Sequence, residues 1–304
     1  MSTFKRNFRD NWQLCLMIAP AIIFFIIFNY VPMVGLILGF KQYNFYDGIF
    51  GSPWCGFDNF KFLFASGKAF ELTVNTILYN LGFLIVGTSL EVTMAIFLSI
   101  MQGRMFKKVT QSLMLLPHFI SWVIVGIFVY SIVNFDNGFL NTILKHLGKD
   151  PVQLYTMPGA WKYIIIFTYC WSHAGYGSIV FLATIMGFDT TYYEAADIDG
   201  ATMWQKTRYI TLPLLKPIII IMVLMAFGRI VKGNFEIFYQ LIGDNGILLK
   251  GNDIIETYVF RALTSGTDFG VSVAVGIYQS VLSFFMIMAM NWAVKKYESD
   301  YALF

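Results

Sequence analysis

Six apolar runs, each long enough to cross a lipid bilayer, constrain this 304-residue chain more than any other feature of its sequence. A helix needs about 20 mainly apolar residues to cross the hydrocarbon layer. In lipid an open chain satisfies its backbone hydrogen bonds only as a helix, so the runs predict helices rather than strands. The sequence therefore predicts an all-α polytopic membrane protein with a transmembrane domain over residues 14–294 and spans over residues 14–40, 72–101, 111–133, 161–187, 214–231 and 270–294.

Composition and the N-terminus agree with this class. The chain is 57% hydrophobic and 13% charged, and its net charge of +3 is scattered, which gives no support for nucleic-acid binding. Lys5, Arg6 and Arg9 precede the first run as they would in a signal peptide. That run is too long for a signal segment and lacks a cleavage site of small residues at its end, so we expect an uncleaved first span.

The distribution of lysine and arginine predicts the orientation, because short cytoplasmic segments keep these residues. Eleven lie on one side of the predicted spans, against eight on the other side in longer loops. The richer side holds the tails 1–13 and 295–304, the link after the second span, and the loop 188–213 with the residues up to Pro217 that follow it. We expect these segments in the cytoplasm of a multi-pass cell-membrane protein. The eleven are Lys5, Arg6, Arg9, Arg104, Lys107, Lys108, Lys206, Arg208, Lys216, Lys295 and Lys296.

Patterns for enzyme chemistry are missing from the sequence. It contains no phosphate-binding loop of the GxxxxGK[ST] type, and His118, His146 and His173 are far apart with no carboxylate at metal-ligand spacing. Glu91 is the clearest intramembrane acid, and we interpret it as a packing residue rather than an ion-coupling group. The sequence therefore predicts no enzyme chemistry and no cofactor or metal bound by this chain, and if the protein transports a solute, we expect its energy to come from a partner.

The loop 188–213 is too polar to lie in hydrocarbon. From Glu194 it reads EAADIDGATMWQKTRYITLPLLKP. Its pattern predicts a short helix from Glu194 to Asp199, broken at Gly200, and a second short helix from Ala201 to Ile210 that stops before the proline at 213.

This loop resembles the EAA loop in permease subunits of binding-protein-dependent ABC importers. In that family a glutamate and two alanines precede a glycine six residues after the glutamate, and I-x-L-P follows. Thr207 departs from the sugar-handling branch, which usually has an aromatic residue there. The matching residues are Glu194, Ala195, Ala196, Asp199, Gly200, Ala201, Ile210, Leu212, Pro213 and Pro217.

The resemblance covers nearly the whole chain and is strongest to the branch that handles oligosaccharides and complex glycans. The third span contains a stretch typical of that branch, LPHFISW at 116–122, and the last outer loop contains TYV at 257–259. The first span and the loop after it contain YVPM at 30–33, FK at 40–41 and GSPW at 51–54.

The resemblance implies a function and a set of partners. It implies a six-helix permease for oligosaccharides that forms a heterodimer with a second permease. It also implies two cytoplasmic ATPases, which hold ATP and Mg²⁺, and an extracytoplasmic sugar-binding protein. The EAA loop would be the coupling helix that docks on an ATPase.

Similarity to the maltose permeases suggests where the sugar would bind. Tyr169, His173 and Tyr176 recur at i, i+4 and i+7 on one helix face, and Arg229, Asn234 and Glu236 lie around the end of the fifth span. Aromatic faces stack on sugar rings, and amide or charged groups bind hydroxyls. Tyr278 in the last helix is a further candidate. The alternative for the aromatic residues is ordinary helix packing.

Two other functions fit the sequence. One is an ion-coupled secondary transporter. The other is an EAA-type permease for a non-sugar solute, such as a polyamine or phosphate.

Overall fold

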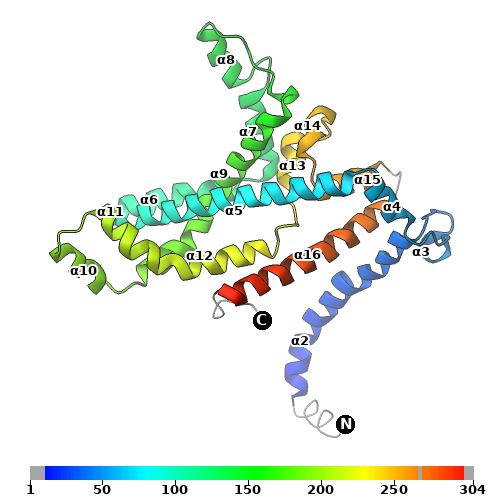
Figure 1. The fold of residues 1–304 in the computed structure, drawn as a ribbon, viewed down its shortest axis with the longest axis horizontal. Coiled ribbons are helices and arrows are strands. Elements are labelled where there is room, and N and C mark those ends of the chain that lie inside the picture. The colour runs from blue at the N-terminus through cyan, green and yellow to red at the C-terminus, as the bar shows by residue number, and fades with distance from the viewer. Residues whose placement is uncertain (1–10, 266–268, 298–304) are drawn as a thin grey trace. The chain divides into compact units, whose positions relative to one another are not determined.

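The computed structural model describes residues 11–265 and 269–297, and they form helices and connecting loops with no named strand. A single β-bridge pairs Lys41 with Trp54. This confirms the predicted all-α class (Figure 1). The tail cations Lys5, Arg6 and Arg9, and the tail residues 298–304, lie outside the described residues.

The described residues contain five helices that are long and apolar enough to cross a membrane. A sixth apolar run is formed by a pair of helices that meets at a bend of 96°. The chain divides into two compact units, residues 1–66 with 259–278, and residues 67–258 with 279–304.

The first unit begins with one long helix. It runs as α2 (Trp12–Phe25), a π-helical turn (Ile26–Tyr30) and a 3-10 segment (Val31–Phe40). Two short helices follow, α3 (Gly48–Gly51) and α4 (Asp58–Ala65). Lys41 holds α3 in place, because its Nζ donates to the Ile49 and Phe50 carbonyls of that helix at 3.1 and 2.6 Å.

The second unit is built on α5 (Lys68–Ile100) and α9 (Pro158–Met186), which pack along each other (Figure 1). α12 (Leu212–Phe227) joins them through a buried cluster that includes Leu98, Phe181 and Leu215. A second cluster, which includes Phe83, Trp161 and Phe238, connects α5 and α9 to α13 (Phe235–Ile242) and α14 (Gly246–Asn252). Both clusters place bulky side chains where the helices cross.

Shorter elements include α8 (Phe139–His146), a 3-10 turn (Leu154–Thr156) and α15 (Ile255–Thr264), whose residues are divided between the two units. Asn252, which is 1% exposed, ties α14 to the longer helices. It accepts from the Tyr79 hydroxyl of α5 and donates to the Pro158 carbonyl at the start of α9. α16 (Phe269–Tyr297) contributes residues to both units.

The third apolar run, which the sequence predicted as a span over residues 111–133, is broken by a bend. It consists of α6 (Arg104–Leu115), a 3-10 turn (Leu116–Phe119) and α7 (Trp122–Val133). Ile120 and Ser121 are extended, with ψ of 128° and 147°, and this interrupts the helix. Pro117 cannot donate a hydrogen bond to the preceding turn, which favours the break.

The predicted second short helix over 201–210 is wrong in its bounds. α11 (Met203–Lys206) continues through a π-helical turn (Thr207–Thr211) directly into α12. Leu212 keeps helical angles although it precedes Pro213. Its N–H donates to the Thr207 carbonyl, five residues earlier. This wider turn shifts the carbonyls away from the proline ring, so the helix passes a residue that usually ends one.

Candidate functional site

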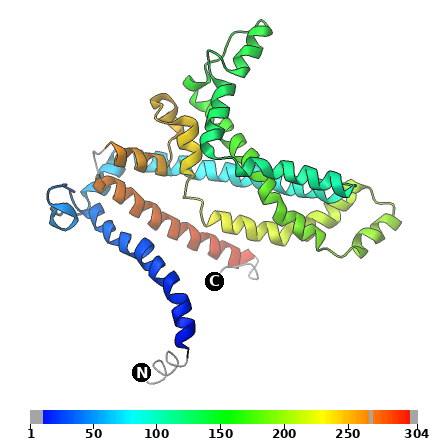
Figure 2. The same cartoon turned by 180° about the vertical axis from the view of Figure 1, so that it is seen from behind.

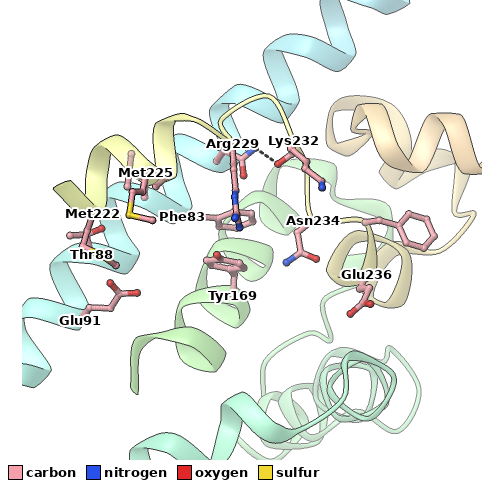
Figure 3. A pocket seen from close by; sticks show the side chains of 15 residues that line it. Phe83, Thr88, Glu91, Tyr169, Met222, Met225, Arg229, Lys232, Asn234 and Glu236 are labelled. Atoms are coloured by element: carbon pink, nitrogen blue, oxygen red, sulfur yellow. Dashed lines mark hydrogen bonds between the residues drawn. The ribbon is translucent and has the colours of Figure 1, made fainter. Parts of the chain in front are cut away.

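A cavity of about 610 Å³ opens in the second unit, between α5, α9, α12 and the segment that follows α12 (Figure 3). Four predicted site residues line it, Tyr169, Arg229, Asn234 and Glu236. The sequence did not indicate the contribution of α5. That helix supplies Asn80, Phe83, Leu84, Thr88 and Glu91.

The cavity combines apolar side chains with charged and amide groups. Phe83 and Tyr169 stack, with ring centroids 4.0 Å apart. Figure 3 shows Arg229 pointing toward this pair, with Asn234 beside it and Glu91 at the other side of the cavity. Met222 and Met225 of α12 close it with flexible apolar side chains. Such a surface can hold a ligand that has both apolar faces and hydroxyl groups.

The non-helical segment 228–234 is held by side chains from three other helices. Asn80 of α5 donates to the Ile230 and Lys232 carbonyls at 2.7 and 3.1 Å. Gln279 of α16 donates to the Val231 carbonyl at 2.7 Å. Because these bonds satisfy backbone groups that left the helix, they fix where Arg229 and Asn234 enter the cavity.

Glu256 of α15 completes this support. Its Oε1 accepts from the Gly233 N–H and from Gln279, both at 2.6 Å. Its Oε2 is buried and has no hydrogen-bond partner among the described residues. Burial raises the pKa of the Glu256 carboxyl, against the opposing hydrogen bonds from Gln279 and Gly233.

His173 and Tyr176 lie outside the cavity lining, in an aromatic cluster with His118 and Trp122. His118 stacks on Tyr176 at 4.3 Å, and His173 stacks on Tyr169 at 4.2 Å. The stack therefore continues from Phe83 and Tyr169 in the cavity toward the bend of the third run. Tyr278 belongs to the first unit, where it packs edge-on against Phe64.

Glu91 is the residue that sequence reasoning undervalued. It lines the cavity and packs directly on Gly177 of α9, where a Cβ would fall on the carboxyl group. The signal in the sequence was a polar stripe. Asn80, Thr88 and Glu91 recur at helical spacing on one face of an apolar run.

The loop 188–213 has a defined corner. α10 (Thr191–Ile198) ends with Ala201 N–H bonded to the Ala196 carbonyl and Gly200 N–H bonded to the Asp197 carbonyl. Gly200 has φ of +71°, which favours glycine over residues with a Cβ. Thr202 then caps α11, because its backbone N–H and side chain both bond to Gln205.

Two contacts brace the corner. Lys206 forms a salt bridge with Asp197, and the Tyr193 hydroxyl bonds to the Thr211 hydroxyl at 3.0 Å. Ile198 and Trp204 are 88% and 69% exposed at its tip. Glu194 and Ala195 are exposed on α10, and Ala196 is half-buried. The result is a rigid projection with an apolar tip, at the end of the unit away from α13 and α14 (Figure 2).

The described residues contain no group of three or more His, Cys, Asp and Glu side chains that could hold a metal ion.

Comparison with known proteins identifies the family. Residues 91–299 match the family described as binding-protein-dependent transport system inner membrane component. This range includes the loop 188–213, called the braced loop below, together with α9, α12 and most of the residues that line the cavity. The chain belongs to this family. It is an integral membrane transport subunit, a permease, and not an enzyme. Membership of a binding-protein-dependent transport family excludes the alternative of an ion-coupled secondary transporter.

The permease is similar to curated proteins along nearly its whole length. It is 31% identical to Protein LplB of Bacillus subtilis, over 96% of this chain and 91% of that one. It is 32% identical to the polygalacturonan/rhamnogalacturonan transport system permease protein YteP of the same organism, over 94% of this chain and 89% of that one.

The fold matches a solved transporter. One crystal structure is of a bacterial ABC transporter involved in the import of the acidic polysaccharide alginate. Its matching chain has a TM-score of 0.86 and 32% identity, over 97% of this permease and 99% of that chain. A second structure, of the alginate transporter in complex with an alginate pentasaccharide-bound periplasmic protein, gives a TM-score of 0.84 over 96% of both chains.

Replacement of Glu256 by glutamine tests the support of the cavity. In the unfolded chain this carboxyl titrates near 4.5, and in the folded chain at a higher pH. Its contribution to stability is therefore largest below 4.5 and is lost as the pH rises through the folded pKa. We expect Glu256→Gln to be more thermostable than the wild type at neutral pH, with an advantage that disappears in acid.

Melting temperatures measured across the pH range check this. Glu236→Gln, which changes an exposed carboxyl of the same cavity, should show no such pH-dependent gain. A wild-type protein that is more stable than Glu256→Gln above neutral pH would mean that the buried carboxylate is fully compensated.

Proposed function

We propose that this permease carries oligosaccharides in an ATP-driven importer. The observation that carries the proposal is the cavity, which is lined by Arg229, Glu91 and two asparagines. Charged and amide groups suit the hydroxyls of sugars, and the apolar side chains of Leu84, Met222 and Met225 suit the apolar faces of their rings. The transport substrates named for similar proteins, polygalacturonan/rhamnogalacturonan and alginate, support a sugar rather than a polyamine or phosphate.

The proposed assembly has further members. It consists of this permease, a second similar permease in a heterodimer, two cytoplasmic ATPases that hold ATP and Mg²⁺, and an external sugar-binding protein. The periplasmic protein in the alginate complex supports the last of these. Both termini and the loop 188–213 are proposed to face the cytoplasm. The cationic start of α6 lies at the same end of the unit as α10, which supports this orientation (Figure 1).

The braced loop is proposed to be the contact with the ATPase. Its exposed apolar tip suits a cleft on another protein, and the Lys206–Asp197 salt bridge holds α10 to α11 so that the two move together. The proposed coupling residues Glu194, Ala195, Ala196, Asp199, Gly200 and Ala201 form the projection. Ile210, Leu212 and Pro213 lie where it joins α12. Closure of the ATPases would shift the permease between its inward- and outward-facing states.

Uptake by the reconstituted transporter tests the substrate class. Vesicles that contain the permease with its partner permease and ATPases, supplied with the binding protein, should accumulate labelled oligosaccharides only when ATP is inside. The same vesicles should not accumulate labelled polyamine or phosphate. ATP-driven uptake of either of these, with none of oligosaccharides, would reject the proposal.

Changes in the corner should uncouple the transporter. We expect Gly200→Leu, which strains a left-handed position by about 1–2 kcal/mol, and Glu194→Lys to leave the protein inserted while ATP hydrolysis continues without uptake. Gly200→Asn is the matched control, because asparagine tolerates this conformation. Normal uptake by both Gly200→Leu and Glu194→Lys would reject the docking role.

We also propose that Glu91 binds sugar hydroxyls and that Gly177 makes room for it. Loss of a charged hydrogen bond should raise KM about 10-fold or more in Glu91→Ala. Gly177→Ala should have a similar effect, because the new Cβ displaces the Glu91 carboxyl. In the double variant Gly177→Ala should add nothing.

Gly87→Ala is the control for the added methyl group. It lies one turn before Glu91, and its Cβ would be in ordinary contact with Cys170 at 4.0 Å. If Gly177→Ala raises KM equally with and without Glu91, the glycine acts through helix packing and Glu91 has no part in it.

A further inference from the structure

A groove of about 350 Å³ lies between α6 and α9, separate from the cavity and the braced loop. Its residues come from one face of each helix. The α6 face carries Arg104, Lys107, Lys108 and Gln111, at i, i+3, i+4 and i+7. The α9 face carries Ile179, Leu182, Ala183 and Met186 at the same spacing. The groove therefore has one cationic wall and one apolar wall.

The charges of the cationic wall are not neutralised within the described residues. No carboxylate lines the groove, and none lies within salt-bridge distance of Arg104, Lys107 or Lys108 in the described part of the chain. Three cations at helical spacing repel one another, and a bound anion would relieve this repulsion. The groove thus offers a site for a negative group.

The groove lies at the level where membrane spans end. α5 ends at Ile100, immediately before α6, and the apolar α9 ends at Met186 in the groove itself. α6 packs against α9 (Figure 2). On α6 the apolar residues Met105, Val109 and Leu113 are exposed, at 74%, 45% and 64%. A helix with exposed apolar residues beside a cationic face is typical of the boundary between lipid and water.

We propose that this groove binds an anionic phospholipid of the cytoplasmic leaflet. The phosphate would lie against Arg104, Lys107 and Lys108, and Gln111 would donate to headgroup oxygens. The acyl chains would follow Ile179, Leu182 and Met186 toward the hydrocarbon. Basic grooves between transmembrane helices on this side of a membrane suit anionic headgroups.

The apolar wall distinguishes a lipid from other anions. A soluble phosphate would use the cations and leave the α9 face in contact with water. An acidic protein surface would match the charge but would not enter between two helices along an apolar strip. A phospholipid would contact both walls, with its phosphate on the cations and its acyl chains on the apolar residues. Phospholipids also surround any membrane protein.

Lipid retention by the intact transporter tests the proposal. The complex is placed in bilayers of equal phosphatidylglycerol and phosphatidylcholine, purified, and its bound lipid is measured by mass spectrometry. We expect retention of phosphatidylglycerol over phosphatidylcholine, lost with the combined Arg104→Gln, Lys107→Gln and Lys108→Gln changes. Each cation contributes about 5-fold in affinity, so the three together contribute about 100-fold.

Lys295→Gln with Lys296→Gln is the matched control, because it removes two cations at the end of α16 that do not line the groove. It should retain phosphatidylglycerol as the wild type does. Lys108→Gln alone, at an exposed position, gives the same test with a smaller loss if the triple variant assembles poorly. Equal retention of both lipids by the wild type would overturn the proposal. So would loss of the ATPases from the triple variant while phosphatidylglycerol stays bound, which would assign the groove to a protein.

Discussion

The break after α12 is the constraint on which the cavity depends. Backbone groups at membrane depth have no water to bond, so an interrupted helix survives only where other parts of the protein satisfy it. Asn80, Gln279 and Glu256 do this for residues 230–233. Asn80 and Gln279 do so from apolar spans, where polar side chains are rare, and Glu256 does so from the short helix α15. These bonds hold the break where Arg229 and Asn234 enter the cavity.

The same logic explains the close contacts of α9. Gly175 meets the backbone of Met114, and Gly177 meets the carboxyl of Glu91, both at distances that leave no space for a Cβ. Small residues allow helices to approach closely in lipid, where packing rather than hydrophobic burial drives association. Here close approach also has a chemical result, since it sets the position of a carboxylate in the cavity wall.

Hydropathy predicted the long helices well. The expected spans 72–101 and 161–187 correspond to Lys68–Ile100 and Pro158–Met186, within a turn at each end. Hydropathy could not locate the bend at Ile120 or the π-helical turn at Thr207. Both are set by the pattern of backbone hydrogen bonds, which the polarity of the side chains does not determine. The resemblance to known permeases led to Tyr169, Arg229, Asn234 and Glu236. The spacing of Asn80, Thr88 and Glu91 was a local signal for a polar face on α5, but it could not show that this face meets α9 and α12, which is a tertiary contact.

The braced loop and the cavity are connected by the two helices that flank the loop. α9 carries Tyr169 in the cavity and ends at Met186, 17 positions later, beside the loop. α12 begins at Leu212 and carries Met222 and Met225 into the same cavity. At about 1.5 Å per residue, α9 spans roughly 25 Å between the two sites. The Lys206–Asp197 and Tyr193–Thr211 contacts join α10 to the residues that lead into α12, so the proposed docking of α10 would act on both helices of the cavity wall. Phe181 of α9 and Leu215 of α12 lie in one buried cluster, at positions on both helices that fall between the loop and the cavity residues.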